Sequence, residues 1–502
     1  MRILWIDDEI DMFRPFVYAL RDKGYEVETA TNGPDGIGLA RTHDFNLVLL
    51  DEIMTGMDGL EVLRRLKETD PALLVAMVTK SDQEELIDEA YGKLVDDFII
   101  KPFTPAQLLA VIKRLLEKQQ LISSRIAQEY TAAMNLAERP ETWEDWVDRY
   151  QVLNNWQRLL GRYADPALQD IELDKRREAN GDFSRYVEDN YRAWIAGKGP
   201  VMSHKFVEHF IQPHWDEKPV YLVILDSMRF DQWEAIAPLL REMWNVETDS
   251  YCSLLPSATP YSRNAIFSGL LPLEIARRYP KYWVFEESGQ NRHEAELMNE
   301  LLKRLKFAGR SNYLKVAHGD ELAAARSGLL DHNVRFTAVV INFLDLLIHS
   351  IKTTRLLDEI VPDDAALVGL TRVWFASSPV YEFLRDLAQR DCRVIVTSDH
   401  GFVRVRRPTL IYGSREISAN LRYKHGGALR VEERDAILLN NPADYMLPTE
   451  FTNIKFTIAK SDYYFIYPTK PREYEKAYKY TFQHGGVSLE EMIVPVATLT
   501  PR

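Results

Sequence analysis

Acidic residues and histidines follow apolar segments of the C-terminal half of the sequence, where they could bind metal. The segments VYLVIL, FTAVVI and RVIVT are near-continuous apolar runs, as expected for buried strands of a parallel sheet. Enzymes with such sheets hold their ligands at the carboxyl ends of the strands. A lone strand-end aspartate is usually a helix cap, but several sites together indicate a metal centre. The candidate ligands are Asp226, Asp345, His349, Asp399, His400 and His484.

Thr259 stands at the start of a predicted helix in the segment PSATPYSRNAIFSG. Pro260 suits a first helical position, because its missing N–H would have had no partner there. The backbone N–H groups beside Thr259 would point outward, where the helix dipole favours an anion such as phosphate. An aliphatic hydroxyl is a poor nucleophile unless a base or a metal ion deprotonates it. Thr259 is therefore either a helix N-cap or a nucleophile activated by a neighbouring metal.

A second group of carboxylates ends strands of the N-terminal segment, where strands and helices alternate as in a doubly wound parallel sheet. Asp7 and Asp8 end the first strand and Asp51 ends the third. These charges repel one another unless a hard cation such as Mg²⁺ joins them. Thr79 closes the next strand, and Lys101 precedes Pro102. The hydroxyl and the ammonium group could hold phosphoryl oxygens at this edge.

The composition of the chain sets limits on its class. The 502 residues suggest roughly three domains, and no apolar run approaches the length of a membrane span. Two cysteines, Cys252 and Cys392, provide no disulfide framework, which fits a reducing cytoplasm. The net charge of -13 and the lack of a basic helix-turn-helix signal argue against a DNA-binding output.

Three helices are expected between the two α/β regions. The first runs without Gly or internal Pro from about Thr104 to Met134, and the second begins near Thr142. The third covers about Pro166 to Ala196 and is expected to break at Asn180-Gly181. Aromatic residues recur at helical spacing in the second helix, and we interpret them as core residues of a small bundle.

Residues 1–120 resemble a two-component response-regulator receiver domain, with a flavodoxin-like fold. The motifs are the acidic pair Asp7/Asp8, the acceptor Asp51 in DEIMTGMDG, the switch threonine Thr79, and Lys101 in KPF. The resemblance implies phosphorylation of Asp51 by a sensor histidine kinase. It also implies a Mg²⁺ ion held by Asp7, Asp8 and Asp51, to which Glu52 gives its backbone carbonyl.

Residues 220–502 resemble the alkaline-phosphatase superfamily, in particular its PglZ branch. Thr259 lies ten residues before Gly269 of the pair Ser268-Gly269, which is the spacing found in the family. The sequence also contains the DxxxH and DHG patterns and a late histidine. The resemblance implies two zinc ions. One would be held by Asp345, His349 and His484. The other would be held by the remaining expected ligands, Asp226, Asp399, His400 and the oxygen of Thr259.

The same resemblance implies in-line attack by Thr259 on a phosphate ester, which gives a phosphothreonine that is then hydrolysed. We expect a zinc-dependent phosphodiesterase acting on nucleotides or short oligonucleotides. Two other classes remain open: a protein-binding effector with a structural zinc site, and a phosphomonoesterase or phosphotransferase. Arg229 and Arg263 could contact the substrate or have an ordinary surface role. His425 in a second HGG sequence is either unrelated to the metal or part of a substrate loop.

The order of the parts resembles that of PorX-type response regulators, which are associated with type IX secretion. We therefore expect an α/β multidomain protein with three parts: a receiver (1–120), a three-helix bundle (121–200) and an alkaline-phosphatase-like domain (201–502). A cap insertion is expected at about 270–335, and a second lid at 402–475. The resemblance also implies contact with an extracytoplasmic-function sigma factor or a secretion-motor protein.

The long helix that leaves the receiver predicts how the two ends communicate. A rigid helix of about 30 residues spans roughly 45 Å, so that a change at its base becomes a larger displacement at the bundle. We expect phosphorylation to favour a homodimer through the receiver face. The alternative is a constitutive monomer in which the helix is only a spacer.

Overall fold

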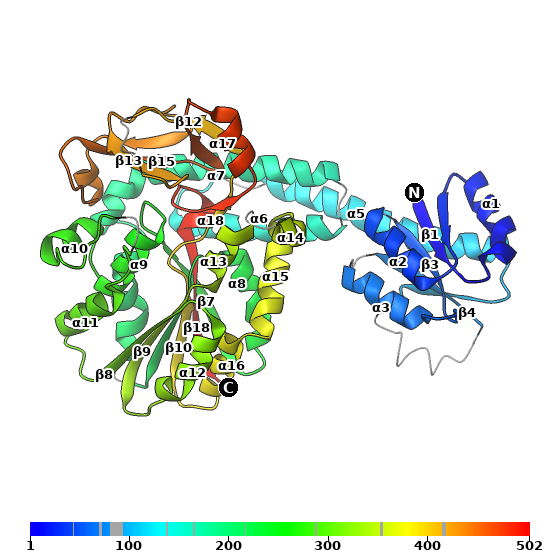
Figure 1. The fold of residues 1–502 in the computed structure, drawn as a ribbon, viewed down its shortest axis with the longest axis horizontal. Helices are drawn as coiled ribbons and strands as arrows, with labels where there is room; N and C mark the ends of the chain where they lie inside the picture. Colours follow the sequence, from blue (N-terminus) through cyan, green and yellow to red (C-terminus); the bar gives the residue numbers. More distant parts are fainter. Residues whose placement is uncertain are drawn as a thin grey trace. The chain divides into compact units, whose positions relative to one another are not determined.

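The computed structural model describes residues 1–43, 45–69, 73–80, 94–136, 139–163, 166–215, 217–286, 289–351, 355–413 and 418–502. They divide into two compact units. Unit 1 comprises Met1–Ala137 and Trp156–Asp170, and unit 2 comprises Glu138–Asn155 and Ile171–Arg502. The two units are described separately, and Figure 1 gives the order of their elements.

Unit 1 is built around a five-stranded sheet in which each strand pairs in parallel with its neighbours, in the order β2-β1-β3-β4-β5. This is the flavodoxin-like order of a doubly wound fold, as the sequence predicted. Its strands are β1 (Arg2–Ile6), β2 (Glu26–Ala30), β3 (Leu47–Asp51), β4 (Leu74–Thr79) and β5 (Asp97–Ile100). Its first helices are α1 (Arg14–Asp22), α2 (Gly33–Thr42) and α3 (Gly59–Thr69).

The sheet of unit 1 is buried on both faces, which explains its apolar strands. One face packs around Trp5, which stacks on Phe13 at 5.4 Å between ring centroids. The other face packs the alternate residues of the same strands, among them Leu4 and Val48, against α2 and α3. The buried strands therefore end at a fixed edge, and this edge carries Asp7 and Asp51.

The long helix expected after the receiver is confirmed as α5 (Pro105–Leu136), which has 32 residues. It is followed by α6 (Trp143–Tyr163) and α7 (Pro166–Ile195). The aromatic residues of α6 pack inward as predicted, since Trp146 is 2% exposed and lies 5.3 Å from the ring of Phe183 on α7.

The break expected at Asn180-Gly181 is wrong, because α7 continues through both residues. The side chain of Asn180 makes two long-range hydrogen bonds, from its Nδ2 to Glu490 at 3.0 Å and from the Leu489 N–H to its Oδ1 at 2.7 Å. Tertiary contacts thus outweigh the low helix propensity of an Asn-Gly pair.

Unit 2 contains a six-stranded sheet in the order β7-β18-β10-β6-β9-β8. Strands β10, β6, β9 and β8 pair in parallel. At one side of them, β18 pairs antiparallel with β10, and β7 pairs antiparallel with β18. The strands are β6 (Val220–Leu225), β7 (Trp244–Cys252), β8 (Arg310–Val316), β9 (Val334–Ile341), β10 (Arg393–Thr397) and β18 (Ile493–Pro501).

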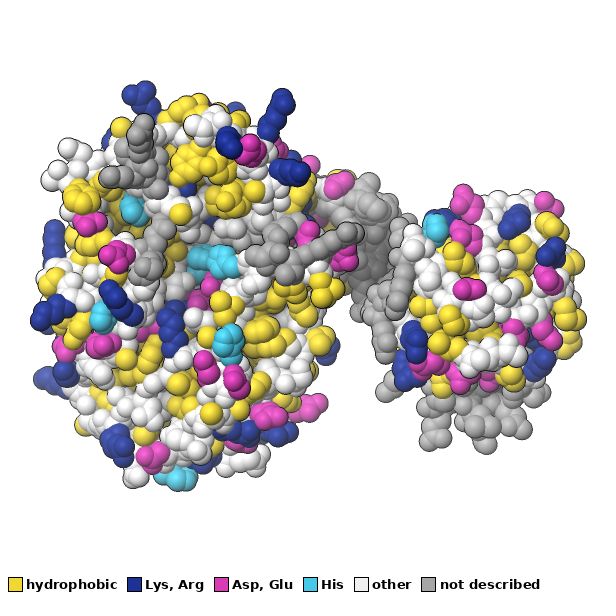
Figure 2. Space-filling model, viewed as in Figure 1, with side chains coloured by type: hydrophobic (Ala, Val, Ile, Leu, Met, Phe, Trp, Pro, Cys, Tyr) yellow, Lys and Arg dark blue, Asp and Glu magenta, His cyan; other side chains and the backbone are white. Residues whose placement is uncertain are grey.

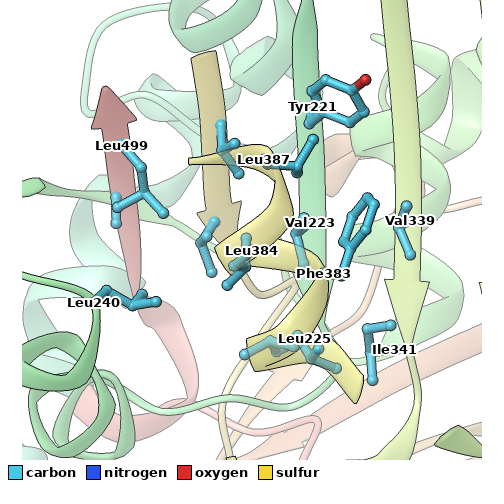
Figure 3. Close-up of a cluster of buried hydrophobic side chains, with 14 of the residues drawn as sticks. Tyr221, Val223, Leu225, Leu240, Val339, Ile341, Phe383, Leu384, Leu387 and Leu499 are labelled. Carbon is cyan, nitrogen blue, oxygen red and sulfur yellow. The ribbon is translucent and has the colours of Figure 1, made fainter. Parts of the chain in front are cut away.

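Helices cover this sheet and complete an α/β layer structure (Figure 1). Figure 3 shows Phe383, Leu384 and Leu387 of one helix, α16, packed over β6 and β9. The helices of unit 2 after α7 are α8 (Phe230–Leu240), α9 (Thr259–Ser268), α10 (Pro272–Arg278), α11 (Glu294–Arg304), α12 (Gly319–Leu329), α13 (Phe343–Ser350), α14 (Arg355–Ile360), α15 (Asp364–Ala376), α16 (Pro379–Leu387), α17 (Pro471–Tyr478) and α18 (Leu489–Met492).

The segment 270–335 is not a separate cap, contrary to our expectation. It contributes β8, which pairs in parallel with β9 as the edge strand of the main sheet, together with the helices on either side of it.

Three small sheets follow β10 in the segment expected to form a second lid. They pair β11 with β17, β12 with β16, and β13 with β15 and β14. Their strands are β11 (Val403–Arg404), β12 (Arg407–Leu410), β13 (Tyr423–Gly427), β14 (Ala436–Leu439), β15 (Ile454–Ala459), β16 (Tyr463–Ile466) and β17 (Phe482–Gln483). Among the described residues, no helix has the length and apolar character needed to cross a membrane.

A buried ion cluster joins α7 to the short helix α18. Arg176 donates from Nε to Glu172 and from Nη1 to Glu490, both at 3.1 Å. All three side chains are less than 10% exposed. Such a pair adds little net stability over an apolar pair, but removal of one partner leaves a buried charge without compensation.

We therefore expect Arg176→Leu to lower the free energy of unfolding by about 3–5 kcal/mol. The matched control is Arg185→Leu, which removes an exposed arginine of the same helix that pairs with Asp182. This control substitution should lower the free energy of unfolding by less than about 1 kcal/mol. Urea unfolding of the full chain, followed by circular dichroism, measures both changes. Equal stability of the two variants would show that the cluster does not hold α7 to α18.

Candidate metal centres

The parallel pairing of β6 with β10 and β9 brings the predicted ligands of unit 2 together. Asp226 directly follows β6, Asp399 follows β10 by two residues, and the register pairs Ile224 with Thr397. Asp345 lies in the first turn of α13, directly after β9, rather than at a strand end. His484 follows β17, which pairs with β11 just beyond the DHG turn.

One set of three side chains converges around Asp345. Its Oδ1 lies 3.4 Å from His349 Nε2 and 3.6 Å from His484 Nε2, and the two nitrogens are 3.2 Å apart. His349 stands one turn after Asp345 on α13, so both side chains share a face of this helix. Burial, together with the neighbouring His400, lowers the pKa of His484 to about 3. The His484 ring is therefore neutral and can donate a lone pair to a metal.

The second set comprises Asp226, Asp399 and His400, all of them buried. Hydrogen bonding fixes the tautomer of His400, because its Nδ1 lies 2.9 Å from the carbonyl oxygen of Gly401, which can only accept. The Nε2 lone pair of His400 is then free to act as an acceptor or ligand. The two sets are adjacent, since the rings of His400 and His484 stack at 4.4 Å between centroids. Figure 2 shows histidine side chains gathered in the middle of the visible face of unit 2.

Thr259 is the first residue of α9, and its hydroxyl does not cap the helix. The N-cap is Ala258, and Oγ1 of Thr259 lies 3.0 Å from Nε2 of His400. The backbone is held by Asn291, whose Nδ2 donates to the Thr259 carbonyl at 3.1 Å. The threonine hydroxyl therefore faces the second set of ligands, which places a weak nucleophile where a metal or base could activate it.

Unpartnered polar atoms test whether these residues fit a metal. Asp226 Oδ1, Asp399 Oδ2 and His484 Nδ1 are buried and make no hydrogen bond within the described part of the chain. Burial raises the pKa of Asp226 well above its usual value, although Arg263 opposes the shift. Buried carboxylate oxygens without partners are costly, and a divalent cation would satisfy them. The donor set thus fits two divalent metal ions.

The two arginines that could contact the substrate or lie on the surface are instead buried ion-pair partners. Arg263 is 1% exposed, and it donates from Nη1 to Asp226 and from Nε to Glu294, both at 2.5 Å. Arg229 is 3% exposed, pairs with Asp231 and Asp364, and lies over the ring of Phe402. Their guanidinium groups are occupied by carboxylates, so we do not retain either residue as a substrate contact.

Three residues that support this centre were not identified from the sequence. Ser227 has a positive φ of 65° and donates from Oγ to Asp345 at 2.9 Å. Glu294 pairs with Arg263 and accepts a hydrogen bond from Tyr313 at 2.5 Å. Glu491 accepts from the backbone N–H of Gly486 at 2.8 Å and so holds the turn that follows His484. Only the position of Ser227 next to Asp226 gave a signal in the sequence.

The acidic group of unit 1 also converges as predicted. Asp7, Asp8 and Asp51 form a cluster that could hold a metal, and Lys101 Nζ lies 2.8 Å from Asp51 Oδ1 and 3.0 Å from Asp7 Oδ2. Burial raises the pKa of Asp51, while Lys101 opposes the shift. The N–H of Thr55 donates to Asp8 at 2.9 Å and lowers its pKa. Three carboxylates and one ammonium group thus surround a single point at the edge of the sheet.

Glu52 and Thr79 contact each other beside this cluster. The hydroxyl of Thr79 donates to the Glu52 carboxylate, and the Glu52 carbonyl accepts from Gly59 N–H at 3.0 Å. A Cβ atom at Gly59 would lie 2.3 Å from the Asp51 carbonyl oxygen, so that only glycine fits this close approach. The glycine that ends DEIMTGMDG therefore fixes the turn after Asp51.

The fold and the two sites define a receiver joined to an α/β domain with a carboxylate–histidine metal centre. Residues 206–499 match the family model of the BREX system PglZ alkaline phosphatase-like domain, and the chain belongs to this family. Residues 3–139 match the response regulator receiver domain, and residues 116–195 match the PorX response regulator linker domain. The three matches together are those of a PorX-type response regulator, as the sequence indicated.

The receiver is also similar to curated proteins and solved structures. The chain is 32% identical over 119 residues to response regulator ArlR of Staphylococcus aureus strains MW2 and COL, which covers 24% of this chain and 53% of ArlR. The chain thus spans about half the length of the curated relatives it matches. A chemotaxis protein CheY4 structure from Vibrio cholerae is 28% identical over 23% of this chain and 98% of that chain, with a TM-score of 0.22. The NtrX receiver domain of Brucella abortus is 33% identical with the same coverage and TM-score.

Proposed function

We propose that the chain is a response regulator whose output domain is a zinc-dependent phosphodiesterase acting on nucleotides or short oligonucleotides. The observation that carries this proposal is the position of Thr259, at the start of α9 and 3.0 Å from His400 Nε2. Its hydroxyl adjoins one ligand set, and the stacked histidine rings join that set to the other. The family match supports a hydrolase of the alkaline-phosphatase superfamily.

Zinc fits the donor types and their spacing. Ligands at roughly 2.1 Å from a tetrahedral zinc ion lie roughly 3.4 Å from one another. The three donor atoms of Asp345, His349 and His484 are 3.2–3.6 Å apart. Asp226, Asp399, His400 and the Thr259 oxygen would hold the second ion. Zinc bound there would lower the pKa of the Thr259 hydroxyl and offset negative charge on the phosphate oxygens.

Residues of the chain have further roles in the proposed reaction. The Thr259 oxygen forms a bond to phosphorus, one ester oxygen leaves, and water later cleaves the phosphothreonine and restores the hydroxyl. The half-buried N-terminal end of α9 favours the anionic phosphate through the helix dipole, because the Tyr261 and Ser262 N–H groups already donate to the Ala258 carbonyl at 3.0 Å. Asn291 holds the Thr259 backbone, and Ser227 orients Asp345. Because Arg229 and Arg263 are already paired, no bidentate arginine clamp for a monoester dianion is found among the described residues near Thr259.

We expect the purified protein to contain about two zinc equivalents per chain. His349→Ala removes a ligand from α13 and should lower zinc content and hydrolysis of bis-p-nitrophenyl phosphate together. Thr259→Ala should lower turnover roughly 1,000-fold or more, because the nucleophile is absent. Plasma mass spectrometry and an absorbance assay measure the two quantities.

His332→Ala is the control, since this exposed histidine follows α12 and belongs to neither ligand set. It should retain both zinc and activity. Activity that survives in zinc-free protein after EDTA treatment would contradict the assignment. Full activity of Thr259→Ala would instead favour a protein-binding effector with a structural zinc site or a different nucleophile.

For the receiver we propose phosphorylation of Asp51 by a sensor histidine kinase, with Mg²⁺ held by Asp7, Asp8, Asp51 and the Glu52 carbonyl. The receiver match itself implies a phosphorylating kinase partner. Lys101 already contacts Asp51 and would bind a phosphoryl oxygen. The PorX linker match supports control of type IX secretion, with a sigma factor or secretion-motor protein as the further partner.

Acetyl phosphate with Mg²⁺ should phosphorylate Asp51, since its carboxylate is the acceptor of the cluster. Phosphopeptide mass spectrometry locates the group. Asp51→Ala should abolish incorporation, whereas Asp22→Ala, which removes an exposed carboxylate at the end of α1, should not change it. Undiminished incorporation in Asp51→Ala would refute the assignment.

Phosphorylation requires a local rearrangement beside β5. The Thr79 hydroxyl must leave Glu52 to reach a phosphoryl oxygen on Asp51. β5 pairs with β4 at Thr79 and ends at Ile100, whose side chain is 50% exposed. This change would alter the surface at the base of α5, and we propose that it favours a homodimer.

Beryllium fluoride with Mg²⁺ should therefore convert the monomer to a dimer, as measured by light scattering at tens of micromolar protein. Asp51→Ala treated in the same way is the control and should stay monomeric. A monomer mass that does not change in the wild-type protein would remove the dimer model and leave α5 as a spacer.

A further inference from the structure

A cavity of about 250 Å³ lies beside the first turn of α9. Aromatic side chains form much of its wall, and polar groups of Gln290, Thr449 and Glu450 also line it. The aromatic residues come from α9, from the loop after α10, from strands β13 and β15 of one small sheet, and from the segment just before β15. They are Tyr261, Trp283, Phe285, His425, Phe451 and Phe456.

Neighbouring residues connect this cavity to the proposed nucleophile. Tyr261 lies two residues after Thr259 on the same helix, so its side chain is turned by roughly 200° about the helix axis relative to that of Thr259. Gln290 lines the cavity, and the next residue, Asn291, donates to the Thr259 carbonyl at 3.1 Å. A ligand in the cavity would therefore be a near neighbour of an ester bound at Thr259.

The opposite wall approaches the His484 turn. Tyr423 of β13 packs edge-on against Tyr261, with ring centroids 5.6 Å apart. A Cβ atom added at Gly485 would lie 2.5 Å from the Tyr423 ring. The strand that carries His425 thus runs past both α9 and the turn after His484, so one wall of the cavity belongs to a strand that also contacts this turn.

The rings of the cavity wall offer several orientations for stacking. His425 and Phe456 stack at 5.2 Å, while Trp283 meets Tyr261 at 58° and Phe285 at 74°. Two rings remain open to solvent, since Phe285 is 39% exposed and Phe451 is 63% exposed. Large apolar side chains exposed together around one hollow are typical of a ligand site rather than of a core.

We infer that this cavity binds the base of a nucleotide ester and so determines which phosphate esters react at Thr259. This inference rests on the proposed function, because it places the scissile phosphate at that residue. A base has a flat aromatic face that the rings can stack on, and polar edges that Gln290, Thr449 and Glu450 can reach. The small volume suits one ring system, whereas a peptide or lipid chain would need a longer groove.

Binding of thymidine 5′-monophosphate and of methyl phosphate to the zinc-loaded full chain tests the inference by calorimetry. The nucleotide should bind roughly 5- to 150-fold more tightly than methyl phosphate, the range for stacking of one base on aromatic side chains. Phe451→Ala and Phe285→Ala should reduce this preference and leave methyl phosphate binding unchanged. Both rings are exposed, so neither substitution should impair folding.

Tyr412→Ala is the matched control, since Tyr412 is an exposed aromatic residue that lines a different cavity. It should leave the preference intact. Equal affinity for the two phosphates, or a preference that persists in Phe451→Ala and Phe285→Ala, would overturn the base site.

Hydrolysis of methyl p-nitrophenyl phosphate separates this inference from the proposed function. Hydrolysis without any preference for the nucleotide would refute the base site and leave the proposed phosphodiesterase activity unaffected. A nucleotide preference that depends on Phe451, in a protein that hydrolyses no ester, would support the base site and reject the enzyme.

Discussion

Two adjacent buried carboxylates, Glu490 and Glu491, hold in place the turns of unit 2 that carry candidate metal ligands. Glu491 accepts two hydrogen bonds from Arg422, at 3.0 and 2.5 Å, and a third from the Gly486 N–H. Its own carbonyl oxygen accepts from the Gly401 N–H at 3.1 Å. Buried charges are tolerated only where such partners surround them. The DHG turn and the turn after His484 are therefore both fixed to α18.

The neighbouring Glu490 extends the same constraint to the linker. Its carboxylate binds Arg176 and Asn180 of α7, while its carbonyl oxygen would lie 2.0 Å from a Cβ atom at Gly401. A displacement of α7 alone would leave Glu490 charged, buried and unpaired, at a cost of several kcal/mol. Within unit 2, α18 thus links α7 to the turns that carry candidate ligands.

Local sequence patterns were sufficient for the sheet of unit 1, for the central strands β6, β9 and β10 of unit 2, and for the convergence of most of the candidate ligands. Strand-end Asp226 and Asp399 follow apolar runs of the length expected for parallel strands, so their convergence could be deduced from topology. The partners of Arg263 could not be deduced, because Glu294 is 31 residues away and no periodicity links them. Asn180 shows the same limit. Its helix-breaking character is local, but the contact with Glu490 that overrides it spans 310 residues.

The pairing of Arg263 also affects the charge available to the substrate. Arg263 is a fixed cation that pairs with Glu294 through Nε and with Asp226 through Nη1, and Glu294 also pairs with Lys315 at 3.3 Å. The ionised groups left to face two divalent ions are then Asp226, Asp345 and Asp399, while the neutral histidines add no charge. In the proposed centre, three carboxylates against two divalent cations leave a single positive charge as long as the Thr259 hydroxyl is protonated. A diester carries one negative charge and a monoester close to two at neutral pH, so this balance suits the diester. In the proposed phosphodiesterase, the buried arginine would therefore favour the diester through its pairing with a carboxylate, and not through contact with the phosphate.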